Sequence, residues 1–581
     1  MNRNRRQPAP AGAVSAREAV ARLRERPQAA VLVIGGGING IATFRDLALQ
    51  GVDVVLVERG DFVSGASSAS SHMIHGGIRY LENGEFRLVK ESVEERNGLI
   101  RIAPHYVKPL ETTVPIFSTF SGVLSAPLRF LTHKSGKPTE RGAALIKTGL
   151  TIYDAFSRDG GAVPRHRFHG AKRSLAELPA LNPGVKYTAT YYDASMHDPE
   201  RLALDVLFDG LAAGPLARAV NYVEAIGHDG AGVRLRDTTT GEEFSVAADV
   251  VVNTSGPWTD VTNADLGEET RFMGGTKGSH IVLDHPELLA ATAGREIFFE
   301  HEDGRIVLIY PLKGRVMVGT TDLEHDMREP AICTEEEVDY FFDLIAHVFP
   351  AIRVDRSQIV YRFSGVRPLP RHDDTQPGFV SRDYRIERAD ASGRPGTTVL
   401  SLVGGKWTTF RALAEHLSGE VLALLGGERV VSTKGLAIGG GAGYPATDDA
   451  RRVWLVSHGD EVGRARAEEL LERYGTRAAA YLADIEGEPE TPLAHHDGYS
   501  RNEIAWLARN ERVVRLQDVV LRRTSLAFTG SLTVPLLDEL AAVVGAELGW
   551  PAGRIAAEVA ATASLLAERH GVELGVPAPV E

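Results

Sequence analysis

The stretch that decides the fold is AVLVIGGGINGIATFRDLALQGVDVVLVE, residues 30–58. Its apolar runs Val31–Ile34 and Val54–Val57 predict two strands that are buried on both faces, as in a parallel sheet. Between them, Ile38–Gln50 has apolar residues at helical spacing, and Gly51 follows where a helix would end. The order strand, helix, strand predicts a βαβ unit.

Glycines in this unit point to a dinucleotide. Gly35, Gly37 and Gly40 fit G-x-G-x-x-G, which lets the backbone approach a pyrophosphate at the positive end of a helix. Glu58 ends the second strand, close to the roughly 20-residue offset at which an acid meets a ribose hydroxyl. An acid there argues against a 2′-phosphate. The alternative is a glycine turn in an ordinary βαβ unit, and the complete set of strand, helix, strand and acid favours the dinucleotide.

Composition sets outer bounds on function. A chain of 581 residues predicts about two or three domains with ample core. The net charge of −13 gives no support to nucleic-acid binding as the main activity. The single cysteine, Cys333, excludes an intramolecular disulfide, and we expect it to pack rather than to link a flavin covalently. No apolar run has the length of a membrane span.

The N-terminal 28 residues contain seven arginines and two glutamates, with proline and alanine between them. They lack the apolar core of a secretory signal. We therefore predict that residues 1–28 form a disordered basic extension.

A serine-rich loop follows Glu58 and leads into HGGIRYL. The hydroxyls of Ser67, Ser68, Ser70 and Ser71 suit phosphate or ribose contacts, whereas the alternative is a flexible surface loop. The glycines, arginine and tyrosine that follow directly do not fit a surface loop.

The segments that come next are charged. Residues 86–103 have the pattern of an amphipathic helix with a mostly solvated face. Residues 120–156 mix apolar clusters with five basic residues against the acids Glu140 and Asp154; the five are Arg129, Lys134, Lys137, Arg141 and Lys147. Such a stretch could lie on an anionic membrane surface or could be a core helix with a polar side, and both interpretations stay open.

The remaining chain alternates strands and helices. The apolar run before Asn253 predicts a buried strand that returns beside the first one. Strands are expected in 278–321 and helices over 199–213, 335–348 and 408–425. The GGGAG segment in 437–449 is followed by polar sequence and Pro445, so we interpret it as a linker rather than a second dinucleotide loop. From about Ala450 onwards we expect only helices.

Several motifs together resemble the FAD-dependent glycerol-3-phosphate dehydrogenases, which belong to the D-amino-acid-oxidase-like flavoproteins. In chain order they are VIGGGINGIA, SSASSHMIHGGIRYLE, VVNTSGPW, KGSHIV, GTTD, FSGVRPL, SRDY and GGKWTTFR, followed by a helical domain that contains LRRT. The basic N-terminal extension lies outside the family pattern.

The resemblance implies an α/β fold in which a Rossmann-like FAD-binding domain is interleaved with an antiparallel-sheet substrate domain, plus an α-helical C-terminal domain. We expect the FAD part at about 29–115, 185–270 and 375–430, the substrate part at about 116–184 and 271–374, a linker at 431–449 and the helical domain at 450–581. It further implies non-covalent FAD, held by Gly35, Gly37, Ile38, Asn39, Gly40, Glu58, Ser70, Ser71, His75, Gly76, Gly77, Val223, Gly256, Gly405, Lys406 and Thr408.

Oxidation of glycerol 3-phosphate requires a phosphate clamp, a base and a flavin that takes a hydride. The family motifs place Arg79, Arg367 and Arg382 in the pocket, where a planar guanidinium suits phosphate. His280 is the predicted proton acceptor, because the ordinary pKa of histidine lies near neutral pH, and His75 is its rival. The other predicted site residues are Lys277 and Tyr80 for the substrate and Lys406, a catalytic residue together with Arg79, Arg367 and His280.

The expected partners are glycerol 3-phosphate, a membrane quinone and a peripheral membrane surface on the inner, cytoplasmic side, with no nucleic acid. An oxidase that uses oxygen and a flavin-binding protein without turnover are the alternatives. The sequence leaves the choice between quinone and oxygen open, as it does the question of a homodimer.

Overall fold

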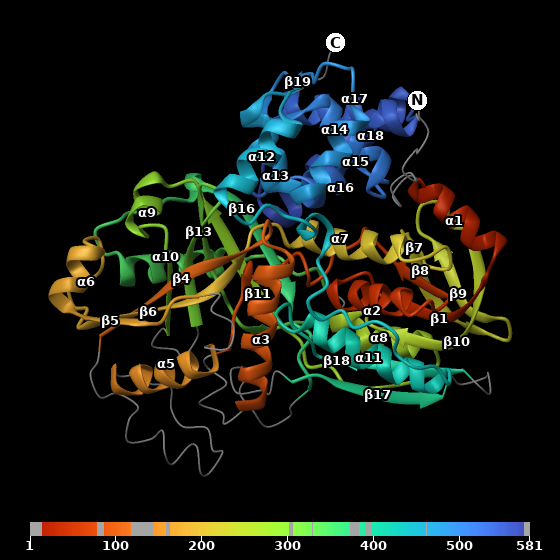
Figure 1. Ribbon diagram of the computed structural model, residues 1–581, viewed down its shortest axis with the longest axis horizontal. Helices are drawn as coiled ribbons and strands as arrows, with labels where there is room; N and C mark the ends of the chain where they lie inside the picture. The colour runs from red at the N-terminus through yellow and green to blue at the C-terminus, as the bar shows by residue number, and fades with distance from the viewer. Residues whose placement is uncertain are drawn as a thin grey trace.

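The structure is a computed structural model that describes residues 14–77, 86–117, 143–157, 163–300, 306–327, 329–371, 383–390, 397–460 and 462–574. Two sheets lie side by side, and a helical C-terminal part caps them (Figure 1). The fold class is therefore the predicted α/β arrangement with a helical C-terminal domain.

The first sheet contains the predicted βαβ unit. Its strand order is β17-β18-β10-β1-β2-β7, with the hairpin strands β8 and β9 attached. The strand β1 pairs in parallel with both β2 and β10, so the predicted return of the third strand beside the first is confirmed. The bounds are β1 Gln28–Ile34, β2 Val54–Glu58, β7 Arg218–Asn221, β8 Val223–Asp229, β9 Gly232–Asp237, β10 Glu243–Asn253, β17 Arg385–Asp390 and β18 Thr398–Val403.

Helices α7 (Pro199–Ala212) and α11 (Phe410–Leu424) both pack against α2 (Ile38–Leu49) beside this sheet. Their apolar faces share one core with strand residues such as Val33 and Leu56. Burial on both faces explains why the central strands are continuous apolar runs. A second core covers the opposite face of the sheet.

The second sheet has the order β15-β11-β14-β13-β12-β4-β6-β3, with β16 paired to β11 and β5 paired to β6. Its bounds are β3 Met73–Ile74, β4 Val107–Ile116, β5 Arg167–Gly170, β6 Tyr187–Met196, β11 Thr276–Leu283, β12 Glu296–Glu300, β13 Ile306–Leu312, β14 Arg315–Gly319, β15 Leu323–Glu324 and β16 Ile359–Val366. The predicted boundaries at 115 and 185 are wrong here, because β4 and β6 pair with each other in this sheet, not in the FAD part.

Helix α10 (Glu335–Val348) covers one face of the second sheet, and the C-terminal domain covers the other. Ile281 and Val318 belong to the core between this sheet and α10, whereas Val282 and Phe363 face the C-terminal helices. Because side chains alternate along a strand, His280 and Phe363 lie on the face toward the C-terminal domain. Shorter helices α6 (Ala171–Glu177) and α9 (Pro286–Ala291) complete this half, whereas α8 (Thr259–Asp265) contacts β8, β10 and β18 of the first sheet.

The N-terminal extension is not disordered throughout. Helix α1 spans Ala16–Glu25, with Ser15 as its N-cap and with Ala16, Val20 and Leu23 buried. The prediction for residues 1–28 is therefore wrong over this helix, because the apolar residues recur at helical spacing and contact the first sheet. The charged residues around them concealed this pattern.

Helix α3 (Phe86–Ile102) confirms the helix predicted at 86–103, but its polar residues are not all solvated: Glu95, Arg96 and Asn97 are buried. Helix α5 spans Ala143–Ser157. The part of the basic segment at 118–142 lies outside the described residues, so the choice between its two interpretations stays open.

The C-terminal domain is mostly helical, as predicted, with α12 Asp448–His458, α13 Arg464–Tyr474, α14 Ala478–Asp484, α15 Arg501–Asn510, α16 Leu516–Asp518, η8 Val519–Arg523, α17 Val534–Leu548 and α18 Ala552–His570. It also holds a short hairpin of β19 (Pro492–Leu493) and β20 (His496–Ser500), which the expectation of helices alone missed. None of the helices within the described ranges has the length and apolar character needed to cross a bilayer.

The GGGAG segment is packed rather than loose. A Cβ at Gly440 would lie 1.9 Å from the carbonyl oxygen of Tyr474, and one at Gly441 would lie 2.2 Å from that of Ile102. The glycines permit close backbone contact between the two parts of the chain. The decision against a second dinucleotide loop agrees with this geometry.

Candidate active site

The glycine turn after β1 is built for close approach. Gly35 has φ +108°, and a Cβ there would lie 2.7 Å from the carbonyl oxygen of Thr254. A Cβ at Gly40 would lie 2.0 Å from the carbonyl oxygen of Gly35. Both positions therefore require glycine, and the turn brings the chain directly to the first residue of α2.

The N-terminus of α2 carries the kind of N–H donors that suit an anion. Gly37 is the N-cap and provides no side-chain hydrogen bond. The N–H of Ile38 instead donates to the hydroxyl of Ser67, at 3.0 Å. The free N–H groups of a helix start favour negative charge, and a hydroxyl from the serine-rich loop now occupies this place.

Glu58 holds the glycine turn from the end of β2. Its carboxylate accepts the N–H of Gly36 at 2.7 Å and the N–H of Gly60 at 2.8 Å. Burial raises the pKa of Glu58, and the two N–H groups oppose that rise. Each carboxylate oxygen keeps a further lone pair, so the residue can still accept a ribose hydroxyl.

Two other predicted contacts lie at the same edge. Val223 begins β8 directly after β7, and Gly256, with φ +64°, follows β10. The carboxyl ends of the neighbouring strands β1, β2, β7 and β10 thus bring Gly35, Glu58, Val223 and Gly256 to one sheet edge, which is where open α/β sheets bind their ligands. The residues fit a dinucleotide.

The turn after β18 closes on this edge. Gly404 and Gly405 have φ +94° and +116°, and a Cβ at Gly405 would lie 2.3 Å from the amide nitrogen of Asn39. Thr408 donates to the carbonyl oxygen of His75 at 3.1 Å. Asn39, His75, Gly405, Lys406 and Thr408 are therefore brought together, from segments that lie far apart in the sequence.

A buried network fixes the HGG segment. The N–H of Gly76 donates to Asp193 at 2.8 Å, and Asp193 also accepts from Tyr153 at 2.5 Å and from Arg96 at 3.0 Å. A Cβ at Gly76 would lie 2.0 Å from the hydroxyl of Tyr153. No sequence pattern indicates these supporting residues, because α3, α5 and β6 meet only in the folded chain.

His280 lies on β11 of the second sheet, between β14 and β16. Its ring shares a hydrogen bond of 2.9 Å with the hydroxyl of Ser71 and stacks on Phe363 at 4.7 Å between ring centroids. The Nδ1 atom has no hydrogen-bond partner among the described residues. Burial, reinforced by nearby Arg367, lowers the pKa of His280 well below the usual range. The ring is neutral at neutral pH and can accept a proton.

Arg367 lies against the same strand. A Cβ at Gly278 would lie 2.2 Å from a terminal nitrogen of its guanidinium. The guanidinium donates to Asp322 at 3.0 Å and to the hydroxyl of Thr320 at 2.9 Å. Because Gly278 and His280 are two residues apart on β11, the arginine and the histidine share one face of the sheet.

The side chain of Lys277 points to the opposite face of β11. Its ammonium forms an ion pair with Glu337 at 2.7 Å and donates to the carbonyl oxygen of Ile332, also at 2.7 Å. It is buried on the α10 side of β11, opposite to His280. This geometry corrects the prediction that Lys277 binds substrate. Predicted residues Arg79, Tyr80 and Arg382 lie outside the described part of the chain.

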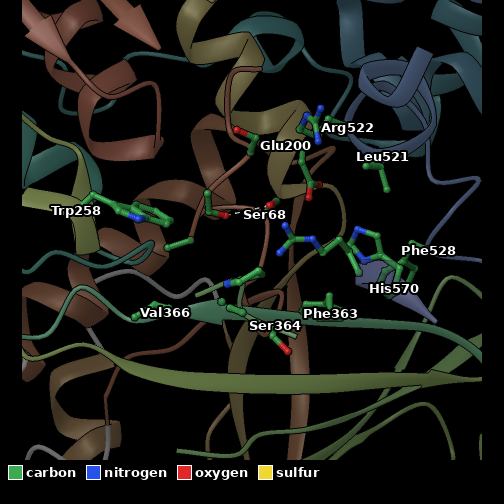
Figure 2. A pocket seen from close by; sticks show the side chains of 18 of the residues that line it. Ser68, Glu200, Trp258, Phe363, Ser364, Val366, Leu521, Arg522, Phe528 and His570 are labelled. Carbon is green, nitrogen blue, oxygen red and sulfur yellow. Dashed lines mark hydrogen bonds between the residues drawn. The ribbon is translucent and has the colours of Figure 1, made fainter. Parts of the chain in front are cut away.

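The serine-rich loop faces three parts of the molecule. Ser67 faces α2 and Ser71 faces His280, whereas Ser70 accepts the N–H of His72 at 3.3 Å. On a further side, Ser68 lines a cavity of about 1000 Å³ that reaches the C-terminal domain. Figure 2 shows Trp258 at one side of this cavity, Phe528 and His570 at the other, and β16 with Phe363 beneath it.

Comparison with known proteins identifies two matching families. Residues 30–418 match the model described as FAD dependent oxidoreductase, and residues 396–555 match the one described as the C-terminal domain of alpha-glycerophosphate oxidase. The first match spans most of the chain and contains every predicted cofactor residue. The second contains the helical domain up to the start of α18.

Similar curated proteins include a glycerol-3-phosphate dehydrogenase of Synechocystis, 33% identical over an alignment of 519 residues that covers 86% of this chain and 88% of that protein. A D-erythritol 1-phosphate dehydrogenase of Brucella abortus is 31% identical over 509 residues, 85% of this chain and 93% of that protein. Among solved structures, glycerol-3-phosphate dehydrogenase from Bacillus halodurans complexed with FAD has a TM-score of 0.71 at 22% identity, over 98% of this chain and 100% of that one. At that identity the likeness concerns the fold.

Proposed function

The chain belongs to the family of FAD-dependent oxidoreductases, and we propose that it oxidises sn-glycerol 3-phosphate to dihydroxyacetone phosphate. One observation carries the proposal: a guanidinium, that of Arg367, and a neutral imidazole, that of His280, share one face of β11 beside the serine-rich loop. A phosphate and an alcohol on a three-carbon substrate call for these two groups.

Arg367 would bind the phosphate. Its fork is already fixed by Asp322 and Thr320, so little side-chain freedom is lost when a ligand binds. A charge-assisted hydrogen bond contributes about 1.5–3 kcal/mol, and a guanidinium keeps its charge at every working pH. Arg79 and Arg382 are proposed as further phosphate ligands from the family motifs alone.

His280 would accept the proton of the carbon-2 hydroxyl. Its hydrogen bond to Ser71 and its stacking on Phe363 fix the ring, and the lowered pKa keeps it neutral and ready to accept. FAD, when bound, takes the hydride from carbon 2, so the alcohol loses one hydride and one proton and becomes a ketone. Lys406 would place positive charge beside the cofactor.

The glycine turn after β1 would hold the adenosine and pyrophosphate half of a non-covalently bound FAD, together with Glu58, Val223 and Gly256. The segments His75–Gly77 and Gly405–Thr408 would hold the flavin half. Acid precipitation tests this binding mode, because a non-covalent cofactor gives a yellow supernatant. Colour that stays with the pellet would contradict it.

A second substrate is favoured by the similarity to D-erythritol 1-phosphate dehydrogenase. Both substrates are polyol phosphates, and an arginine clamp with a base would serve either one. Anaerobic titration of the holoenzyme with each compound separates them. We expect glycerol 3-phosphate to bleach the flavin absorbance at lower concentration and at a higher rate; the reverse order would assign the four-carbon substrate.

For the electron acceptor we propose a membrane quinone, reached by peripheral docking at the cytoplasmic face of the membrane. The support is the basic, apolar sequence of residues 120–150, since each basic group near an anionic surface adds about 1 kcal/mol. Oxygen is the alternative acceptor, and a flavin protein without turnover is the remote one.

Mixing the anaerobically reduced enzyme with a quinone analogue or with oxygen distinguishes the two acceptors. We expect the quinone to reoxidise the flavin faster, and sedimentation with anionic vesicles that weakens at high salt. Reoxidation by oxygen at an equal rate would make the protein an oxidase, and absence of reduction by either polyol phosphate would leave the non-catalytic alternative.

A further inference from the structure

The LRRT motif, residues 521–524, belongs to the C-terminal domain, yet its two arginines reach the first sheet. Arg522 and Arg523 end the short π-helix η8, a distortion that is frequent at functional sites. Both side chains contact Asp61, which precedes them by more than 460 residues and lies three residues after Glu58. All three are buried.

Asp61 is held as a bidentate acceptor. Arg523 donates to its two carboxylate oxygens at 2.7 and 2.9 Å, and Arg522 donates to one of them at 2.5 Å. Asn221, at the end of β7, adds a hydrogen bond of 3.1 Å. Fork geometry of this kind fixes position as well as charge. The two arginines hold the pKa of Asp61 at about 2, against the effect of burial.

The arginines are themselves fixed within the C-terminal domain. Arg523 donates twice to the carbonyl oxygen of Glu511, at 3.0 and 2.8 Å. Arg522 donates to Asp518 at 3.0 Å, and Asp518 accepts the hydroxyl of Tyr222 at 2.6 Å. The C-terminal domain thus holds Asp61 on one segment of the first sheet and Tyr222 on another.

Both segments belong to the cofactor edge. The N–H of Gly60 donates to the carboxylate of Glu58 at 2.8 Å, and the carbonyl oxygen of Gly60 accepts the N–H of Tyr222 at 2.8 Å. Tyr222, with φ +59°, directly precedes Val223. Glu58 and Val223 are therefore each within a few residues of a group that the C-terminal domain holds in place.

We propose that Arg522 and Arg523 of the C-terminal domain are positioning residues of the FAD site, which hold Glu58 and Val223 in place around the adenosine half through Asp61 and Tyr222. This role concerns the cofactor alone and is independent of the substrate and electron acceptor proposed above. It gives the helical domain a part in cofactor binding, although none of its residues was expected in the site.

Arg523→Lys tests the role, because lysine keeps the charge but loses the fork. We expect the holoenzyme to release FAD about tenfold faster, which corresponds to about 1.4 kcal/mol. Release is followed as the rise of flavin fluorescence after dilution. Arg509→Lys is the matched control: it changes a half-exposed arginine of the same domain, which pairs with Asp484 and Glu547, and should leave release unchanged.

Thermal unfolding of the wild type and of Arg523→Lys, each with and without excess FAD, distinguishes a role in the FAD site from a role in the stability of the C-terminal domain alone. A positioning role predicts that added FAD raises the Tm of Arg523→Lys by more than it raises that of the wild type, since the variant starts with sites that have lost cofactor. If the Tm falls equally in both conditions while FAD release stays at the wild-type rate, the arginines only brace the domain and the proposal is wrong.

If Arg523→Lys does not fold, Tyr222→Phe tests the positioning role instead, because this substitution removes only the hydroxyl bonded to Asp518. We expect a severalfold faster release of FAD from this variant. An unchanged rate in the folded Tyr222→Phe protein would equally overturn the proposal.

Discussion

Two properties of Arg367 suit a phosphate ligand: its guanidinium lies against backbone at Gly278, and it remains about one-fifth exposed, at 22% of its side-chain surface. Arg367→Lys keeps the charge but cannot contact both Asp322 and a phosphate. We expect the KM for glycerol 3-phosphate to rise about 10- to 100-fold, the loss of one charge-assisted hydrogen bond, with unchanged flavin content.

The control for this substitution is Arg362→Lys on β16, the strand that directly precedes Arg367; Arg362 pairs with Glu335. Steady-state kinetics with a soluble dye as acceptor measure both variants. Equal KM values for Arg367→Lys and the wild type would place the phosphate elsewhere.

His280 is the second residue with a defined chemical expectation. His280→Gln can keep a hydrogen bond to Ser71 but cannot accept a proton, so anaerobic flavin reduction should slow by about 10²- to 10⁴-fold. The base must be neutral, and burial lowers its pKa; the wild-type rate should therefore fall only below about pH 6.5, the unperturbed value. The variant should lose this acidic limb.

Stopped-flow reduction across pH measures the effect. Ser71→Ala serves as the control, because it keeps the imidazole and removes only the hydroxyl that orients it. Loss of the acidic limb in His75→Gln and not in His280→Gln would transfer the role of base to His75.

At the scale of elements, the packed glycine segment joins the two parts of the chain. Gly440→Ala would place a methyl group 1.9 Å from the carbonyl oxygen of Tyr474, so the backbone must move. We expect a loss of about 1–3 kcal/mol in the free energy of unfolding, as for an overpacked core. Gly98→Ala, in α3, meets nothing within 4 Å and should be neutral or slightly stabilising.

Urea denaturation compares the two glycine variants. If Gly440→Ala is as stable as the wild type, close packing of this linker does not contribute to stability. A large loss in Gly98→Ala would instead show that any alanine in this protein is costly, and the comparison would carry no information about packing.

For the whole molecule, histidines that are buried or half-buried make stability depend on pH. His72, His197 and His570 line the cavity that reaches the C-terminal domain, and burial lowers the pKa of each from 6.5 to about 4. Between these pH values the unfolded chain binds protons that the folded chain does not, so stability is full above pH 6.5 and falls as the pH drops toward 4.

His570→Gln should flatten this dependence, by on the order of 3 kcal/mol at pH 4, since one pKa unit corresponds to about 1.4 kcal/mol. The matched control is His416→Gln, at a ring that is 55% exposed. Urea midpoints measured between pH 7.5 and 4.5 test the expectation. An equal slope for His570→Gln and the wild type would contradict it.

The sequence by itself determined the local features. Apolar runs and glycine spacing predicted β1, α2, β2 and the acid Glu58, because a buried parallel strand and a phosphate-binding turn depend on residues that are adjacent in the chain. The same locality allowed α7, α10 and α11 to be predicted. It failed for α1, where charged residues concealed a short apolar face.

Only the tertiary structure decided which side chains meet. Lys277 and His280 lie three residues apart in one motif, yet the alternation of the strand sends them to opposite faces, one to Glu337 and the other to Ser71. Asp61 and the arginines of LRRT are separated by more than 460 residues, and no local pattern relates them. Contacts of this kind depend on how the two sheets and the helical domain pack, which no single stretch of sequence encodes.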